Sequence, residues 1–312
     1  MNTLACGACT VATGFLPGRE TAAARNLRTP GKGRSWNHGN HEALTRWLRG
    51  AAAVLMLALL GACSTYPSPG GLTIDHSIQA KSQNSRVEFV VLHYTSSNNG
   101  VALKTLSQGN VSSHYLITDD PTPHVYQLVG ENRRAWHAGV SQWYGSCNLN
   151  SASIGIEIVN EGGSGQVWAP YSEAQIAVLK VLLRDIVQRH QIKAANIVGH
   201  SDIAPQRKVD PGPLFPWKEL ARAGLGRWYD EDQVAGNIRA LERSGMPTVR
   251  WFQQELVRVG YAAPSTGVLD KATRNVLRAF QMHYRPSRYD GRPDIETAAI
   301  LQTLQRYVRF RR

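Results

Sequence analysis

Two short, almost wholly apolar runs, residues 87–93 (VEFVVLH) and 154–159 (IGIEIV), have the length and composition of strands buried on both faces of a sheet. A long amphipathic helix is predicted over residues 172–190. Ser172 and Gln175 form a capping box at its start, and apolar residues recur behind them with the helical period. The order of these strands and helices along the chain predicts an α/β fold with a mixed β-sheet flanked by helices.

Shorter elements complete this domain. Residues 101–106 predict a short helix, and residues 196–198 predict a short strand. Residues 114–118 and 125–129 flank a Pro-rich turn, which predicts a β-hairpin. From about residue 245 the pattern changes to short amphipathic helices, which predict a small three-helix C-terminal domain.

The N-terminal region has the features of an export signal. Arg46 and Arg49 precede an apolar run at residues 51–60, and small residues lead from it to Cys63. A basic segment, a short apolar run and small residues before a cleavage site make a secretory signal. The run is too short to span a bilayer comfortably as a helix. The alternative, a buried helix that ends at a chance cysteine, would lack a polar face.

The segment that ends at Cys63 (LGAC) also resembles the bacterial lipobox, in which the cysteine is lipidated and becomes the first residue. The resemblance implies an outer-membrane lipoprotein that faces the periplasm and is held to the membrane by a lipid anchor on Cys63. Ser64 is compatible with that location. Residues 1–43 show no apolar periodicity, and a translation start just before Arg46 is left open.

The formal net charge of +12 predicts an acidic partner, such as nucleic acid, anionic lipid or an acidic polymer. Export removes access to DNA, so we expect no nucleic-acid partner. The arginines near the C-terminus are equally consistent with a solvated helical face. Cys6 and Cys9 lack a second metal-binding pair and lie in the segment expected to be removed. Cys147 is then the only thiol besides Cys63, which excludes a disulfide-stapled fold.

Three residues have the types and positions of metal ligands. His93 closes the first buried strand, His200 follows the short strand at residues 196–198, and Asp210 lies ten residues further on. Two imidazoles and one carboxylate suit Zn²⁺, and three protein ligands leave a fourth position open for water. Taken singly, each histidine favours a structural or solvent-exposed role over that of a ligand. The alternative ligands that remain are His114, His124 and His137.

The candidate ligands lie in short motifs that follow one another along the chain. These are HYT at residues 93–95, RAWHAG at 134–139, SIGIE at 153–157, GHSDIAP at 199–205 and KVDPGP at 208–213. Together they resemble the AmpD/AmiD branch of the N-acetylmuramoyl-L-alanine amidases, a group related to phage-type amidases and peptidoglycan recognition proteins. The resemblance extends over about residues 87–220 and implies the fold of that group.

The resemblance implies a zinc enzyme with His93, His200 and Asp210 as the metal ligands. It makes Glu157 the general base, and a carboxylate in an otherwise apolar strand needs a purpose or a partner. It gives Lys208 the task of stabilising the oxyanion of the tetrahedral intermediate, for which a fixed cation is suited.

Two further residues, His137 and Asn150, are candidates for substrate binding. The sequence also departs from some relatives. Asp210 stands where phage-type amidases and recognition proteins often have a cysteine. Ser113 stands where some relatives carry a tyrosine, which leaves the proton transfer to Glu157.

The last part of the chain carries a second resemblance. VRWFQQEL at residues 249–256, GVLD at 267–270 and FQ at 280–281 follow the pattern of the three-helix peptidoglycan-binding domain. Whether it still binds the wall is left open. The predicted organisation is an N-terminal extension and lipoprotein signal (1–63), a tether (64–80), a zinc amidase catalytic domain (81–236) and a peptidoglycan-binding-like helical domain (245–308).

The function expected from these resemblances is zinc-dependent hydrolysis of the amide bond between N-acetylmuramic or 1,6-anhydro-muramic acid and L-alanine. The substrates would be peptidoglycan or muropeptides, and the purpose wall turnover and recycling. We expect a monomer. The alternative is a non-catalytic peptidoglycan-binding or recognition lipoprotein, which would keep the fold but lack the metal ligands or the base.

Overall fold

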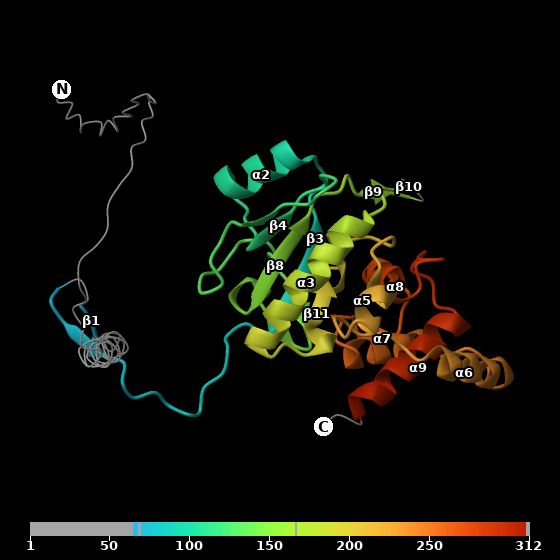
Figure 1. The fold of residues 1–312 in the computed structure, drawn as a ribbon. Coiled ribbons are helices and arrows are strands. Elements are labelled where there is room, and N and C mark those ends of the chain that lie inside the picture. Colours follow the sequence, from blue (N-terminus) through green and yellow to red (C-terminus); the bar gives the residue numbers. More distant parts are fainter. Residues whose placement is uncertain (1–64, 68–69, 166, 310–312) are drawn as a thin grey trace, which may run out of the picture. The chain divides into compact units, whose positions relative to one another are not determined.

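The computed structural model describes residues 65–67, 70–165 and 167–309 of the chain (Figure 1). These residues belong to two compact units, Met1–Lys81 and Ser82–Arg312. The predicted export signal, including Cys63, lies outside the described residues. Within the described ranges, no helix combines the length and the hydropathy needed to cross a membrane.

The first unit contains one pair of short strands among its described residues. β1 (Thr65–Pro67) and β2 (Thr73–Asp75) pair antiparallel, and the residues of β2 are exposed. The pair falls in the stretch for which the sequence predicts only a tether, so this stretch holds more regular structure than its Pro/Gly/Ser-rich composition indicates.

The second unit is built on a five-stranded sheet with the order β11-β3-β8-β4-β5. β3 (Phe89–Tyr94) pairs in parallel with β8 (Ser153–Ile158) on one side and with β11 (Ile197–Gly199) on the other. β4 (Tyr115–Ile117) is parallel to β8, and β5 (Val125–Gln127) closes the edge antiparallel to β4. The predicted mixed sheet is confirmed.

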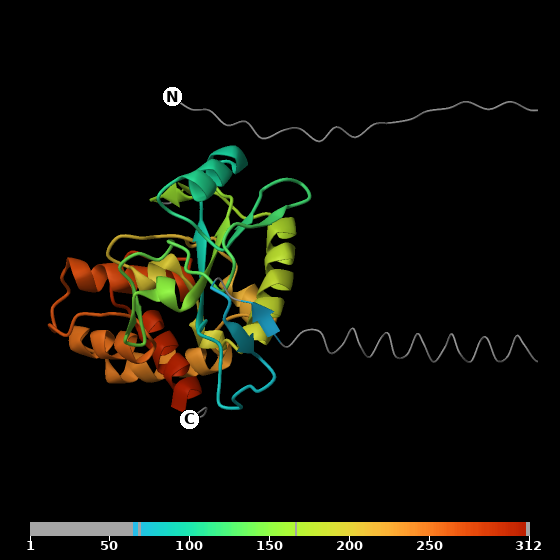
Figure 2. The same cartoon turned by 90° about the vertical axis from the view of Figure 1, so that its left-hand side faces the viewer.

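Successive residues of β3 and β8 face opposite sides of the sheet. Leu92 and Ile156 belong to the buried cluster that α3 (Glu173–His190) covers. The predicted capping box at the start of α3 is present. His93 and Glu157 therefore point to the face away from α3. Figure 2 shows α3 in yellow-green on one side of the sheet and the orange and red C-terminal helices on the other.

The C-terminal helices are α7 (Val249–Arg258), α8 (Lys271–Tyr284) and α9 (Ile295–Arg309), as the sequence predicts. A further helix, α6 (Glu231–Ser244), is not predicted from the sequence. Asp230 caps it through Gln233 N, and its Asn237 Nδ2 donates to Thr303 Oγ1 of α9 (3.0 Å). The predicted gap between the two domains thus lies inside a helix that belongs structurally with the C-terminal group.

The core runs without a break from the sheet into these helices. One buried cluster includes Phe89 and Val91 of β3 together with Phe252, Tyr261 and Phe280 from the helical part. The apolar surface of the sheet away from α3 is therefore covered by the C-terminal helices, and the two parts share their hydrophobic stabilisation.

The remaining elements are short and lie around the sheet. They are α2 (Asn99–Gln108), β6 (Gln142–Trp143), β7 (Ser146–Cys147), η1 (Leu149–Ser151), β9 (Gly163–Ser164), β10 (Val167–Trp168), η2 (Ala194–Asn196), α4 (His200–Ile203) and α5 (Trp217–Arg222).

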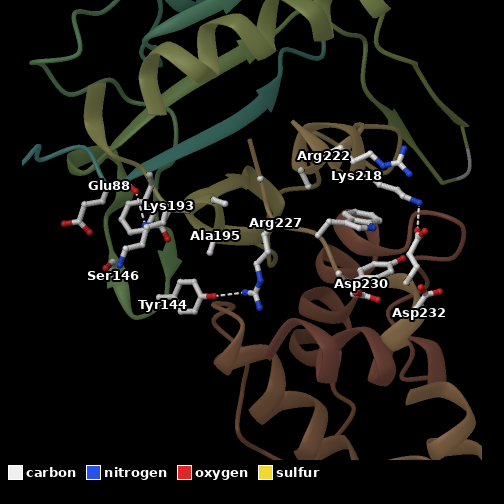
Figure 3. Close-up of a pocket in the computed structure, with 18 residues that line it drawn as sticks. Glu88, Tyr144, Ser146, Lys193, Ala195, Lys218, Arg222, Arg227, Asp230 and Asp232 are labelled. Carbon is white, nitrogen blue, oxygen red and sulfur yellow. Dashed lines mark hydrogen bonds and ion pairs between the residues drawn. The ribbon is translucent and has the colours of Figure 1, made fainter. Parts of the chain in front are cut away.

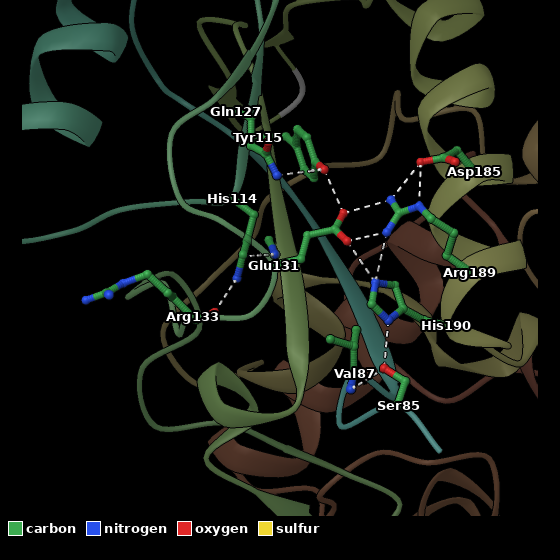
Figure 4. A network of polar contacts seen from close by, with 11 residues as sticks. Ser85, Val87, His114, Tyr115, Gln127, Glu131, Arg133, Asp185, Arg189 and His190 are labelled. Atoms are coloured by element: carbon green, nitrogen blue, oxygen red, sulfur yellow. Dashed lines mark hydrogen bonds and ion pairs between the residues drawn. The ribbon is translucent and has the colours of Figure 1, made fainter. Parts of the chain in front are cut away.

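A polar network ties the loop after β5 to the end of α3 (Figure 4). Glu131 accepts hydrogen bonds from Tyr115 Oη (2.6 Å), from Arg189 Nη2 (2.9 Å) and from His190 Nε2 (2.8 Å). The other ring nitrogen of His190 lies 2.6 Å from Ser85 Oγ. Burial raises the pKa of Glu131, but the bonds from Arg189, Tyr115 and His190 outweigh it and hold this pKa at about 2.

Candidate metal centre

The parallel strands bring the candidate ligands to one edge of the sheet. His93 is the fifth residue of β3, and Gly199, the last residue of β11, pairs with Leu92. His200 begins α4 directly after that strand. The carbonyl of Asp210 accepts a hydrogen bond from Ser201 N (2.8 Å), which holds the loop of Asp210 against the start of α4.

The three predicted ligands converge on one point. His93 Nδ1, His200 Nδ1 and Asp210 Oδ2 lie 3.0 Å from one another in all three pairs. All three residues are buried, with exposed fractions of 1%, 3% and 7%, and no other such group occurs within the described ranges. Atoms at these separations can all lie about 2.0 Å from one point, which matches zinc–nitrogen and zinc–oxygen bond lengths.

The protonation of His200 follows from its surroundings. Its Nε2 lies 3.1 Å from the carbonyl oxygen of Ala138. A carbonyl only accepts, so Nε2 carries the proton and Nδ1 keeps its lone pair toward the shared point.

His93 is fixed in the same tautomer through a chain of hydrogen bonds. Its Nε2 lies 3.0 Å from His137 Nδ1, and His137 Nε2 lies 3.2 Å from Ser153 Oγ. Ser153 Oγ donates to the carbonyl of Leu149 (2.6 Å). The carbonyl sets the direction of the chain, so His93 Nε2 donates to His137 and His93 Nδ1 is free to bind a metal.

The charges suit a divalent cation. Burial, together with the neighbouring His200, lowers the pKa of His93 to about 4. Burial raises the pKa of Asp210, but His200 and His93 outweigh this and hold it below the ordinary value. At neutral pH, His93 is therefore neutral and Asp210 ionised, the forms in which imidazoles and carboxylates bind metal ions.

Glu157 lies beside the ligands. It pairs with His93 in the register of β8 and β3. Burial, and then the charge of Asp210, raise the pKa of Glu157 well above its ordinary value, while Lys208 opposes the shift. Glu157 Oε2 is buried and has no hydrogen-bond partner in the described structure, so it is available to a bound molecule.

The two residues predicted to bind substrate lie behind the ligands. His137 is 9% exposed and contacts His93 as described above. Asn150 Oδ1 accepts from the backbone N–H of His137 (3.0 Å) and of Ala138 (2.7 Å). The structure thus places both where they hold the ligand histidines, and a contact with substrate stays a prediction.

The other alternative ligands do not reach the metal group. His114 Nδ1 accepts from Gly155 N (3.0 Å), and its Nε2 donates to the carbonyl of Arg133 (3.1 Å). His124 stacks on Tyr126, with ring centroids 5.7 Å apart. His114 is thus a buried structural residue, whereas His124 is exposed.

Sequence reasoning missed two residues of the site. Ser153 ends the hydrogen-bond chain from His93, and Gly155 leaves room for the His137 ring. A Cβ at position 155 would lie 2.4 Å from His137 Cγ. The SIGIE motif contains both residues, but only the packing of His137 against β8 gives them these roles.

A cavity of about 1050 Å³ lies at the other end of the strands (Figure 3). It is lined by Glu88 at the start of β3, by Lys193, and by Arg227, which donates to Tyr144 Oη (2.9 Å). None of the candidate metal ligands lines this cavity. The candidate active site is therefore the buried group of His93, His200 and Asp210, and not the cavity. A mixed sheet that carries a buried histidine–aspartate group able to bind a metal, beside a buried carboxyl, is the arrangement expected of a metal-dependent hydrolase.

Comparison with known proteins assigns the family. Residues 83–213 match the family described as N-acetylmuramoyl-L-alanine amidase (Amidase_2), and residues 245–301 match one described as putative peptidoglycan binding domain. The chain is 40% identical over 267 residues to the N-acetylmuramoyl-L-alanine amidase AmiD of Escherichia coli, covering 83% of this chain and 96% of that protein. It therefore belongs to the N-acetylmuramoyl-L-alanine amidases.

Two solved structures extend this likeness to the fold. AmpDH3 of Pseudomonas aeruginosa has a TM-score of 0.72 and 44% identity, and the match covers 76% of this chain and 98% of that one. The complex of E. coli AmiD with anhydro-N-acetylmuramic acid-L-Ala-D-gamma-Glu-L-Lys has a TM-score of 0.70 and 38% identity, covering 78% and 98%.

Proposed function

We propose that this amidase uses zinc, held by His93, His200 and Asp210, to cleave the bond between N-acetylmuramic or 1,6-anhydro-N-acetylmuramic acid and L-alanine. The observation that carries the proposal is the convergence of three buried ligand atoms at 3.0 Å separations. The donor set and the fixed tautomers fit zinc. The substrate class is supported by the muropeptides bound in the AmiD and AmpDH3 complexes.

When bound, zinc would act as a Lewis acid on the scissile carbonyl and would lower the pKa of a bound water. The protein's own groups do the rest. Glu157 accepts a proton from the attacking water at Oε2, the buried oxygen without a partner in the described structure. It then gives this proton to the leaving amine. Burial and the charge of Asp210 raise the pKa of this carboxyl above its ordinary value, which makes its carboxylate a stronger base. The Lys208 ammonium stabilises the negative charge that develops on the carbonyl oxygen.

One experiment tests both the activity and the metal. The mature protein would be incubated with purified sacculi and with anhydro-muropeptides, with and without a chelator, and the products identified by mass. We expect release of L-alanine-terminated peptides from both substrates, lost with chelator and restored by zinc. A folded, zinc-loaded protein that binds sacculi but releases no peptide would favour the alternative of a non-catalytic recognition lipoprotein.

Two variants separate metal binding from proton transfer. His200→Ala should lose the zinc that metal analysis finds in the wild type. Glu157→Gln should keep it and yet lose most turnover, because the amide preserves the shape but accepts no proton. A full zinc content in His200→Ala, or near-normal turnover in Glu157→Gln, would contradict the corresponding role.

We also propose that the enzyme works on the periplasmic side of the outer membrane, anchored by acyl chains on Cys63, in wall turnover and recycling. The support is the signal-like sequence before Cys63, and several acyl chains on one residue hold far more firmly than one. Cys63→Ala should move the activity from the membrane to the soluble fraction, or leave an uncleaved precursor. A soluble wild-type protein that incorporates no labelled fatty acid would refute the anchor.

A further inference from the structure

Asp202 connects the metal site to the helical domain. It lies in α4, two residues after His200, and is completely buried. Its Oδ2 accepts from the backbone N–H of Gly199 (2.7 Å), which caps the start of α4. Its other donors come from the C-terminal part: Tyr261 Oη donates to Oδ1 (2.6 Å) and His283 Nδ1 donates to Oδ2 (2.8 Å).

Both donors are held rigidly. The His283 ring lies between Trp217 and Tyr284, stacked on each with centroids 3.9 Å and 4.1 Å away. Its Nε2 is buried without a partner in the described structure. A carboxylate oxygen only accepts, so Nδ1 carries a proton toward Asp202. The Tyr261 ring meets Trp143 edge to face at 4.9 Å.

A second contact joins the helical domain to the surroundings of the site. Tyr289, between α8 and α9, accepts a hydrogen bond from Trp168 Nε1 (3.0 Å) and donates to the carbonyl of Gly165 (2.8 Å). The Trp168 ring lies close to Tyr94, which follows His93, with centroids 6.5 Å apart. The helical domain thus contacts both α4, which carries His200, and Trp168, which lies against the residue after His93.

The length of α4 makes these contacts decisive. A helix of four residues is not stable by itself, because the cost of nucleation is not recovered over so few hydrogen bonds. The position of α4, and with it the direction of His200 Nδ1, depends on tertiary contacts. A buried carboxylate is itself tolerated only when its hydrogen bonds are satisfied.

We propose that Tyr261 and His283 are positioning residues of the metal site. By holding Asp202, the helical domain keeps His200 Nδ1 at 3.0 Å from His93 Nδ1 and Asp210 Oδ2. The inference rests on the proposed zinc function, and it gives the helical domain a role in metal binding that is separate from any contact with the wall.

The test compares two variants of the full-length mature protein. Tyr261→Phe removes one donor to Asp202. Asn237→Ala is the matched control, because it breaks a buried hydrogen bond in the same domain, to Thr303, without touching Asp202. Zinc affinity would be measured by competition with a chromophoric chelator, and ligand geometry by the visible absorption of the cobalt(II)-loaded protein.

We expect Tyr261→Phe to bind zinc about tenfold more weakly, as for other partners that support metal ligands, and to change the cobalt spectrum. Asn237→Ala should change neither, even if both variants lose thermal stability. If Tyr261→Phe does not fold, His283→Ala and His283→Asn take its place. The asparagine amide can donate where Nδ1–H does, so it should recover most of the affinity that alanine loses.

Folded variants with wild-type zinc affinity and an unchanged cobalt spectrum would overturn the positioning role. That result is distinct from a failure of the proposed function, in which the wild-type protein itself would bind no zinc or release no peptide.

Discussion

Gly155→Ala tests the chain of hydrogen bonds behind His93 with a single methyl group. Gly155 lies in the middle of β8 and has no positive φ, so alanine fits its backbone conformation. The added Cβ would lie 2.4 Å from Cγ and 2.6 Å from both Cδ2 and Nδ1 of His137, where ordinary contacts begin at 3.4 Å. The imidazole would have to move by about 1 Å to restore such a contact.

The size of the effect follows from this displacement. The bond from His93 Nε2 to His137 Nδ1 is 3.0 Å long, and a shift of about 1 Å takes it beyond hydrogen-bonding distance. Losing that bond costs about 1 kcal/mol, and inserting a methyl group into a packed interior costs about 1–3 kcal/mol. We therefore expect the free energy of unfolding to fall by about 2–4 kcal/mol. Zinc affinity should fall about 10- to 100-fold.

Urea unfolding of the metal-free protein and zinc competition measure the two effects separately. Gly236→Ala is the control, since its Cβ would have nothing within 4 Å and it lies inside α6. It should gain stability, by up to about 1 kcal/mol, from helix propensity, with zinc affinity unchanged. If Gly155→Ala matched the wild type in both measurements, the His137 ring would not be confined as described, and its support of His93 would be refuted.

Two further predictions concern charge. Lys208→Ala should lower kcat more than it raises KM, as steady-state kinetics would show, because the proposed contact of Lys208 with the oxyanion would form mainly in the transition state. The fold should also lose stability in acid. The pKa of Glu131 is about 2 in the folded chain, against an ordinary 4.5, so its contribution is complete above about pH 4.5 and is lost as the pH falls toward 2. Urea unfolding between pH 2 and 6 should show a smaller loss for Glu131→Gln, and equal losses in both proteins would contradict this account.

The large elements of the fold could be predicted because their sequences are locally consistent. The apolar runs of β3 and β8 and the capping box of α3 each indicate one structure. The two-residue strands of β6 and β9 have no period to detect. Each pairs with another two-residue strand close by in the chain, β7 and β10 respectively, and such short pairs leave no periodic pattern in the sequence.

The candidate metal ligands could be predicted from the sequence, but the residues that hold them in place could not. His93, His200 and Asp210 are the donors that zinc prefers, and the parallel register of β3 and β11 brings two of them together. His137 was predicted to bind substrate, which stays a prediction, and the structure adds a contact of its ring with His93. From the sequence, a histidine in a loop motif is equally suited to supporting a metal ligand or to contacting substrate. The support of His93 by His137 becomes visible only from the contact of His137 with Ser153.

The contacts of Asp202 could not be predicted from the sequence pattern. Asp202 lies in the GHSDIAP motif, and in the structure its carboxylate caps the first turn of α4 by accepting from Gly199 N. Its two other donors lie 59 and 81 residues further along the chain, one after the end of α7 and one in α8, in a region whose pattern indicates only a wall-binding domain. A domain joined by a flexible linker could be exchanged without effect on catalysis. A domain that supplies two donors to a completely buried carboxylate cannot be exchanged in this way. Its removal would leave the carboxylate without those two donors and the short helix of His200 without their support.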